Sequence, residues 1–290
     1  MSFSSDNNNW WPAPAKLNLF LHITGRRADG YHELQTIFQL LDFGDRLRLK
    51  VRADGQIERL SAIAGVEPQH DLTLRAARLL QQRSGCELGV SIEIDKRIPM
   101  GGGLGGGSSD AATVLVVLNQ LWHTGLDLEE LAELGLSLGA DVPVFVHGES
   151  AWGEGVGEQL SSVQLPEQWF FVLCPNVCIP TAELFASPQL TRDARPIKIR
   201  DYLAGSGSNV FESLVRDRYP VVNEAMLWLT QTSGTQARLT GTGSSIFVAL
   251  NDEQQAQTIM ATLPDRWQGF YARGVNRSPL ISRLAKVSGK

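Results

Sequence analysis

Residues 98–110 read Ile-Pro-Met-Gly-Gly-Gly-Leu-Gly-Gly-Gly-Ser-Ser-Asp, and six of the seven positions 101–107 are glycine. Because glycine has no Cβ atom, such a loop can turn its backbone N–H groups inward around an anion. A helix that follows adds its unpaired amides and its positive dipole end. A flexible linker is longer and more polar than this run, which Pro99 precedes and a periodic apolar segment follows. The stretch therefore predicts a cradle for the phosphates of a nucleotide triphosphate.

The segment after the glycines has the spacing of an amphipathic helix. Its apolar positions are Val114, Leu115, Leu118, Leu121 and Trp122. The expected N-cap is one of three polar residues, Ser108, Ser109 or Asp110.

Two common nucleotide loops do not fit the sequence. No Gly-Lys-Ser/Thr follows the glycines, so the loop is not a Walker A motif. Residues 101–106 match G-x-G-x-x-G, but so many glycines make that match nearly automatic. The preceding segment alternates Val90, Ile92 and Ile94 with polar residues, which predicts an antiparallel strand. A second helical pattern then follows instead of a strand. The βαβ unit of a dinucleotide-dependent oxidoreductase is therefore missing.

Composition narrows the class of protein. A chain of 290 residues with 43% hydrophobic content can form two modest domains, and we expect them at residues 11–160 and 161–290. The net charge of -5 argues against nucleic-acid binding, and the apolar runs are too short for a membrane span. Residues 1–10 are expected to be a disordered extension without the features of a secretory signal. Cys86, Cys174 and Cys178 form no C-x-x-C pair, which favours reduced thiols in a cytoplasmic protein with small-molecule partners.

Two polar positions in the first half lie where chemistry is possible. Alternation over residues 15–23 predicts a strand that carries Lys16 and Asn18 on one face. A helix should begin after Asp127, with Glu130 as its capping-box partner, and end at Gly139. Asp141 then lies at a junction among apolar residues, where a turn or cap role and a catalytic role are both open.

The other expected elements are coarser. Residues 34–49 are strand-like but broken at 42–45, and a helix over 71–82 should be capped by Asp71. After Pro166 a strand is expected over 169–173, then a helix that starts at Pro180 and Thr181, and another over 219–229. A second glycine turn, residues 240–245, lies between two apolar runs and is a candidate for a second loop that contacts an anion.

Three separated segments resemble the GHMP kinase superfamily: residues 12–19, the glycine loop with Ser108 and Ser109, and residues 239–243. Four others, residues 16–18, 25–32, 139–143 and 179–181, narrow the resemblance to members that phosphorylate 4-diphosphocytidyl-2-C-methyl-D-erythritol. The resemblance extends over residues 11–280. It implies a two-domain α+β fold, with an N-terminal domain like ribosomal protein S5 domain 2 and a ferredoxin-like C-terminal domain.

The resemblance also implies an activity, the ATP- and Mg²⁺-dependent phosphorylation of the substrate's 2-hydroxyl in the non-mevalonate route to isoprenoid precursors. Asp141 would accept the hydroxyl proton, while Lys16 orients both groups and offsets charge. Mg²⁺ would be held mainly by phosphates and water. The protein would be a monomer or a homodimer. The implied ATP-binding residues are Lys96, Pro99, Met100, Gly101, Gly102, Gly103, Leu104, Gly105, Gly106, Gly107, Ser108 and Ser109.

At the cytidyl end the resemblance implies an aromatic clamp. Tyr31 and Phe185 would stack on the two sides of the pyrimidine, and His32 would hydrogen-bond its edge. The remaining implied contacts are Asn18, Val156 and Thr181 to substrate, and Thr240, Gly241 and Gly243 to phosphate. Val210 departs from the family pattern, which has an acidic residue there.

Two alternatives to this interpretation remain open at the sequence level. One is another superfamily kinase, acting on homoserine, mevalonate or a sugar, for which an aromatic clamp has no purpose. The other is a regulatory nucleotide-binding module without catalysis, against which Lys16 and Asp141 argue.

Overall fold

The structure is a computed structural model, which describes residues 9–63 and 65–287. The expected disordered extension, residues 1–10, lies outside the described residues except for its last two positions. The elements of the first half are β1 (Trp11–Arg26), β2 (His32–Arg52), β3 (Ile57–Arg59), α1 (Leu72–Ser84), β4 (Gly89–Asp95), α2 (Gly106–Leu121), α3 (Leu128–Leu138), α4 (Val142–His147), β5 (Ala151–Glu154) and β6 (Gln159–Ser162). The elements of the second half are β7 (Trp169–Pro175), α5 (Thr181–Ala186), α6 (Ile199–Leu203), α7 (Glu212–Arg218), α8 (Pro220–Ser233), β8 (Arg238–Leu239), β9 (Ile246–Leu250), α9 (Glu253–Ala261), β10 (Trp267–Val275) and α10 (Pro279–Val287).

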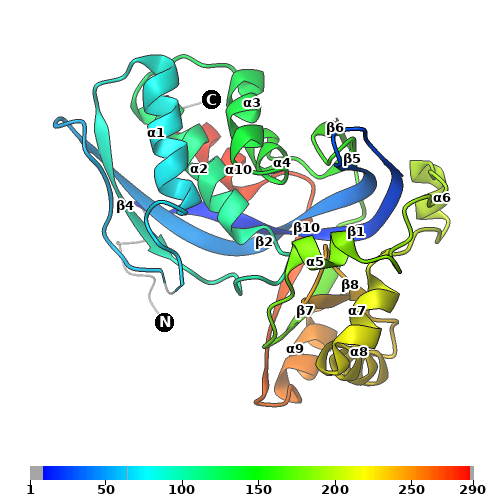
Figure 1. Cartoon of the computed structure of the whole chain (residues 1–290). Coiled ribbons are helices and arrows are strands. Elements are labelled where there is room, and N and C mark those ends of the chain that lie inside the picture. Colours follow the sequence, from blue (N-terminus) through cyan, green and yellow to red (C-terminus); the bar gives the residue numbers. More distant parts are fainter. Residues whose placement is uncertain (1–8, 64, 288–290) are drawn as a thin grey trace.

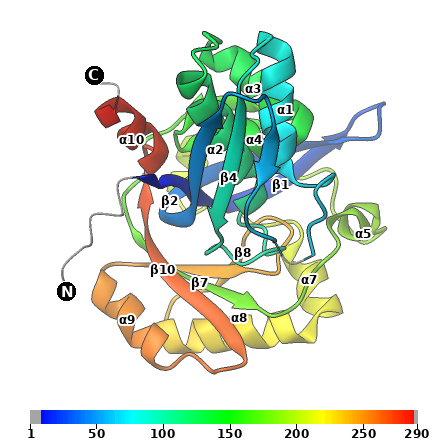
Figure 2. The ribbon, with the colours of Figure 1, turned by 90° about the vertical axis from the view of Figure 1, so that its left-hand side faces the viewer.

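Helices α1 to α4 cover one face of the first-half strands, and α8 and α9 cover the strands β7 to β10 (Figure 1). The two groups of strands are joined by β10, which pairs with β7 over most of its length and with β2 at its last two residues. Figure 2 shows this strand running from the lower layer into the upper one. An apolar cluster that contains Leu17, Leu104 and Phe170 lies across the junction. Helix α10 returns to the first half, where Leu280 packs with Trp11. The predicted boundary at residues 160 and 161 stays a prediction.

Several local predictions are confirmed. Strand β4 is antiparallel to β2. Asp71 caps α1 by accepting from the Thr73 N–H, and Asp127 with Glu130 forms the capping box of α3. Helix α5 begins at Thr181, and α8 covers the helix expected over 219–229.

The predicted break of the second strand at residues 42–45 is wrong, because β2 runs through it. Polar side chains there have partners that keep them inside the strand: Asp42 accepts from the Arg273 N–H at 2.8 Å, and the buried Asp45 accepts from the Ile98 N–H at 2.7 Å. Gly44 lets β1 approach closely, since a Cβ at this position would lie 2.0 Å from the carbonyl oxygen of Ala13. This polar run lies where the pairing of β1 with β2 is irregular, as the register shift at residues 14–16 shows.

The predicted N-cap of the helix after the glycines is also wrong. Helix α2 begins at Gly106 with Gly105 as its N-cap, in the left-handed conformation with φ +74°. Ser109 and Asp110 are instead inside the helix and buried, and Asp110 binds Lys96. The loop glycines therefore enter the helix directly, and its first amides stay free of a side-chain cap.

Candidate active site

Three segments far apart in the sequence meet around the glycine loop. The Lys16 N–H donates to the carbonyl oxygen of Leu104 at 3.0 Å, which ties β1 to the loop. The Ser245 N–H donates to the carbonyl oxygen of Gly102 at 3.2 Å, and the Asn18 N–H donates to Thr240 Oγ1 at 2.8 Å. These bonds bring residues 16–18, 101–107 and 240–245 to one place.

Alternate glycines of the loop have positive φ. Gly101, Gly103 and Gly105 have φ of +73°, +75° and +74°, a region that residues with side chains rarely adopt. Space is also limiting, because a Cβ on Gly103 would lie 2.8 Å from the carbonyl oxygen of Thr240. This alternation is typical of backbone that turns successive N–H groups into a concave anion site, here leading into the N-terminus of α2.

Lys16 is held beside a carboxylate at the edge of the loop. It is 3% exposed, and its Nζ lies 3.3 Å from Asp141 Oδ2 while also donating to Asn18 Oδ1. Asn18 in turn donates from Nδ2 to Thr36 Oγ1 at 2.9 Å, so its amide is fixed. Asp141 precedes α4 but accepts no capping hydrogen bond from that helix. Unlike Asp71 and Asp127, its carboxylate is free to face Lys16 and the cleft.

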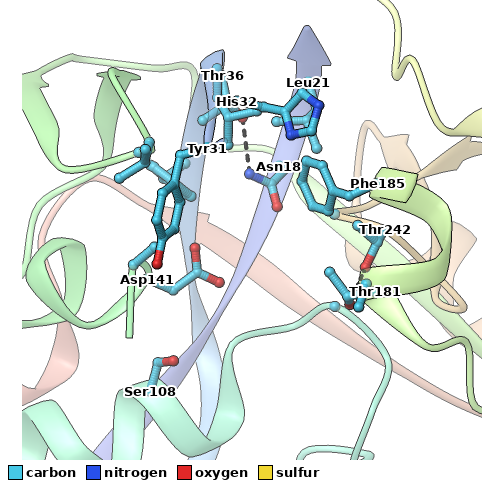
Figure 3. A pocket seen from close by; sticks show the side chains of 18 of the residues that line it. Asn18, Leu21, Tyr31, His32, Thr36, Ser108, Asp141, Thr181, Phe185 and Thr242 are labelled. Carbon is cyan, nitrogen blue, oxygen red and sulfur yellow. Dashed lines mark hydrogen bonds between the residues drawn. The ribbon is translucent and has the colours of Figure 1, made fainter. Parts of the chain in front are cut away.

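A cleft of about 810 Å³ opens above this pair. In Figure 3 the rings of Tyr31 and Phe185 lie on opposite sides of the cavity, with Asn18 between them and Asp141 and Ser108 below. Tyr31 is 65% exposed, so its ring is available to a ligand. The ring of Phe185 packs on that of His32, with centroids 5.1 Å apart. The cleft thus has aromatic walls at one end and a lysine–carboxylate pair at the other.

A second pocket of about 370 Å³ lies on the other side of the glycine loop. It is lined by loop residues and by a part-apolar patch from the segment before α1 and the first turn of that helix: Ile63, Val66, His70, Asp71, Leu72 and Thr73. Gly103 and Ser108 line both cavities. A molecule in the second pocket would therefore meet the contents of the cleft at these two residues.

Lys96 lies at the base of the second pocket between two carboxylates. Its Nζ donates to Asp45 Oδ2 and, at 2.9 Å, to Asp110 Oδ2. Burial lowers the pKa of Lys96, but the carboxylates outweigh this and hold the pKa above its ordinary value. Burial raises the pKa of Asp110 to about 7, against the pull of the Lys96 ammonium. Since Asp45 also accepts from the Ile98 N–H, the cluster ties the start of the glycine loop to α2.

Most of the residues predicted for the site come together. The predicted residues that line the cleft are Lys16, Asn18, Tyr31, His32, Gly103, Ser108, Asp141, Val156, Thr181, Phe185 and Gly241. The predicted residues that line the second pocket are Lys96, Pro99, Met100, Gly101, Gly102, Gly103, Leu104, Gly105, Gly106, Gly107 and Ser108.

Three predicted residues stand back from both cavities. Ser109 and Thr240 are fully buried, the latter as the acceptor for Asn18, and Gly243 shapes the second loop at φ +84°. Val210, where the family pattern has an acid, packs against the apolar core of the second half. Its neighbour Asn209 is the polar group there, because its Nδ2 donates to the carbonyl oxygen of Gly241 at 2.8 Å.

Sequence reasoning missed several residues that line the cleft. Thr36 and Phe38 enter it because β2 pairs with β1, and nothing in the sequence gives that register. Thr242 was adjacent to predicted positions, and its Oγ1 lies 2.9 Å from Thr181 Oγ1. The patch at the start of α1, which lines the second pocket, carries no ligand-binding motif in the sequence. Among the residues that the structure describes, no group of three or more His, Cys, Asp or Glu could hold a metal ion, and no helix is long and apolar enough to cross a membrane.

Comparisons with known proteins show the family to which the chain belongs. Residues 71–149 match the family model for the GHMP kinases N terminal domain, and residues 190–269 match the model for the GHMP kinases C terminal. A 4-diphosphocytidyl-2-C-methyl-D-erythritol kinase of Nitrosococcus oceani is 58% identical over 96% of this chain and 98% of its own length. A relative of the same name from Halorhodospira halophila is 57% identical over 96% of this chain and 97% of its length.

Solved structures show the same fold. A crystal structure of 4-(cytidine 5'-diphospho)-2C-methyl-D-erythritol kinase superposes with a TM-score of 0.80 at 31% identity, over 92% of this chain and 99% of that one. The mevalonate kinase of Methanococcus jannaschii superposes with a TM-score of 0.65 at 16% identity, over 92% of this chain and 98% of that one. The second likeness concerns the fold alone.

Proposed function

This chain belongs to the family of 4-diphosphocytidyl-2-C-methyl-D-erythritol kinases within the GHMP kinases, and from that premise we propose that the cleft and the second pocket form its active site. The fold predicted from the sequence, a two-domain α+β GHMP kinase fold, is confirmed. The chain is a phosphotransferase with an alcohol acceptor: it transfers the γ-phosphoryl group of ATP to the 2-hydroxyl of 4-diphosphocytidyl-2-C-methyl-D-erythritol and releases ADP. The product belongs to the non-mevalonate route to isoprenoid precursors.

The observation that carries the assignment of the site is the position of the Lys16–Asp141 pair. It lies in the cleft that shares Gly103 and Ser108 with the second pocket. ATP in the second pocket would extend its γ-phosphate along the glycine N–H groups toward this shared wall. The acceptor hydroxyl, in the cleft, would approach from the side of Asp141. Phosphoryl transfer needs this in-line positioning more than it needs covalent help from the protein.

Asp141 acts as the proton acceptor for the substrate hydroxyl. Its carboxylate is not used as a helix cap, it borders the cleft, and it is 36% exposed, so a hydroxyl can reach it. Lys16 holds the carboxylate in place and offsets negative charge as the hydroxyl oxygen attacks phosphorus. Lys16 is itself positioned by its hydrogen bond to Asn18, whose amide is fixed by its bond to Thr36. Proton acceptance of this kind contributes on the order of 10²- to 10⁴-fold to a rate.

The cytidyl group is bound between Tyr31 and Phe185, with His32 at its edge. The exposed ring of Tyr31 and the ring of Phe185, already braced by His32, support a stacking site at the far end of the cleft. Stacking of a base on an aromatic side chain is worth about 1–3 kcal/mol per contact. Asn18, Val156 and Thr181 line the space between base and hydroxyl.

Bound with ATP, Mg²⁺ would neutralise charge on the triphosphate. The side chains fit a metal held mainly by phosphate oxygens and water, because Asp141 lines only the cleft and is paired with Lys16, and Asp110 is engaged with Lys96. A cytoplasmic location fits the use of ATP and the three free cysteines Cys86, Cys174 and Cys178. The protein would be a monomer or a homodimer. Residues 11–160 and 161–290 would form its two domains.

The experiment that tests this function measures ADP release by the purified protein with ATP and Mg²⁺. The acceptors are 4-diphosphocytidyl-2-C-methyl-D-erythritol, homoserine, mevalonate and galactose, each against a control without acceptor. Turnover with the cytidyl compound alone supports the proposal. Faster turnover with another acceptor would reject the aromatic clamp, and turnover with none would reject catalysis.

A further inference from the structure

Arg192, in the segment after α5, binds the His32 ring at the edge of the proposed base site and the backbone of Phe185, one of its two walls. Its Nε donates to His32 Nε2 at 3.1 Å. Its Nη2 donates to the carbonyl oxygens of Phe185 and Ser187, each at 2.8 Å, and its Nη1 donates to that of Leu190 at 3.1 Å. The guanidinium therefore caps the C-terminal end of α5, the helix that carries Phe185, and reaches the His32 ring that packs on Phe185.

The bond to His32 determines which ring nitrogen carries the proton. An arginine side chain is always protonated and only donates, so His32 Nε2 must be an unprotonated acceptor. The single ring proton is then on Nδ1. No hydrogen bond of His32 Nδ1 occurs among the described residues, and His32 lines the cleft. One ring nitrogen points toward the cavity side in Figure 3.

We propose that Arg192 is a positioning residue for the base site: it locks His32 in the Nδ1–H tautomer, so that the ring presents a hydrogen-bond donor to an acceptor atom on the edge of the pyrimidine. Cytosine has such acceptors at N3 and O2. The statement about the substrate rests on the proposed function, but the tautomer is a property of the free protein. Nothing in the sequence pattern pointed to Arg192.

The charges around the ring agree with a neutral imidazole. The pKa of His32 lies below its ordinary value, first because burial removes solvation and then because of the positive charges of Arg192 and of Arg26 on β1. In the described part of the chain the Arg192 guanidinium donates only to a ring nitrogen and to backbone carbonyl oxygens, so no carboxylate in direct contact offsets its charge there. His32 is then neutral, with one donor, through the neutral pH range.

The test compares Arg192→Met with Arg218→Met. Arg218 binds the same segment through Ser187 Oγ at 2.6 Å and Gln189 Oε1 at 3.2 Å, and its hydrogen bonds in the described part of the chain do not include His32 or Phe185. The Met side chain is similar in length to arginine and cannot donate to His32. Arg218→Met therefore loosens the segment after α5 but keeps the Arg192–His32 hydrogen bond. Arg192→Lys keeps one charged donor that can reach His32.

The first readout is the tautomer, from the ¹⁵N chemical shifts of the His32 ring in substrate-free protein, assigned by the signal missing in His32→Asn. We expect Nδ1–H in the wild type and Arg218→Met, and a mixture in which Nε2–H predominates in Arg192→Met. Nε2–H in the wild type, or an unchanged tautomer in Arg192→Met, would overturn the proposal whatever the enzyme's substrate.

The second readout is the KM for the cytidyl substrate. At pH 8 we expect about a tenfold increase in Arg192→Met with kcat within about twofold, as for the loss of one hydrogen bond, and a smaller increase in Arg192→Lys. At acid pH a protonated His32 carries an N–H at Nδ1 whatever its tautomer, so the KM of Arg192→Met should return toward the wild-type value as the pH is lowered. A merely loosened segment would give no such recovery. An increase that is the same at both pH values, or equal in Arg218→Met, would overturn the proposed role, while an inactive wild type would overturn the function alone.

Discussion

Lys16 Nζ lies 3.3 Å from Asp141 Oδ2, although the two residues come from the first strand and from the start of α4. The ammonium is buried and the carboxylate is partly open to the cleft. A buried lysine needs a compensating charge, and here that charge is the same carboxylate that borders the acceptor site. The stability of one group and the chemistry of the other therefore depend on a single contact.

Replacing Lys16 by Met should reduce kcat by roughly 10²- to 10³-fold, since a positioned charge near the reacting oxygen is lost. The KM for ATP should change little, because the glycine loop keeps its own backbone contacts. Lys50→Met, at an exposed position of β2, is the matched control and should leave kcat unchanged. Steady-state kinetics with a melting curve for each variant checks this. Equal losses in both variants would contradict the role of Lys16.

Replacing Tyr31 by Ala should raise the KM for the cytidyl substrate by about 5- to 100-fold, the range expected for one lost base-stacking contact. Tyr31 is exposed, so neither folding nor the KM for ATP should change. Tyr31→Phe keeps the ring and should remain within about threefold of the wild type. An equal increase in the two KM values would indicate instead a general defect.

Replacing Gly103 by Ala should abolish measurable ATP binding. The new Cβ would lie 2.8 Å from the carbonyl oxygen of Thr240, and φ is +75°. Gly125→Ala is the matched control, because Gly125 has φ +73° but nothing within 4 Å of a Cβ. Both variants have the backbone strain of about 1 kcal/mol, but only the first moves the loop. Isothermal titration with ATP and Mg²⁺ distinguishes them, and an undiminished affinity in Gly103→Ala would contradict the loop's role.

The Lys96 cluster should make stability depend on pH. The pKa of Asp110 is raised from 3.8 to about 7, so the folded chain holds a proton that the unfolded chain releases between these values. Its contribution is fully present below pH 3.8 and is lost as the pH rises through 7. Asp110→Asn removes this dependence, so the Tm of the variant minus that of the wild type should grow by a few degrees from pH 5 to pH 8. A constant or shrinking difference would contradict the raised pKa.

Local signals in the sequence predicted the starts of helices α1 and α3 well. Asp71 and the Asp127–Glu130 pair determine helix starts through contacts within four residues, and such contacts can be read from spacing. The strand through residues 42–45 was missed because the partners of Asp42 and Asp45, Arg273 and Ile98, are distant in the sequence. Residues 42–45 therefore resembled a turn in the sequence, because a local pattern does not show partners that are distant along the chain.

The candidate site divides in the same way. The glycine loop is a dense motif and was found directly, whereas Asp141 was ambiguous by spacing alone and became a candidate base only through a family resemblance. Thr36 and Phe38 depend on the pairing of β1 with β2, and Arg192 on a loop that folds back to His32. These positions are determined by tertiary contacts that leave no local pattern.

The most direct test of the central claim is the rate of phosphoryl transfer by Asp141→Asn, measured with γ-labelled ATP and the cytidyl substrate. Asparagine keeps the shape of the side chain but cannot accept the hydroxyl proton. The account predicts a kcat lower by at least about 10²-fold with ATP affinity close to that of the wild type, and a lower Tm because the buried Lys16 loses its compensating charge. A kcat within about threefold of the wild type would show that Asp141 is not the proton acceptor.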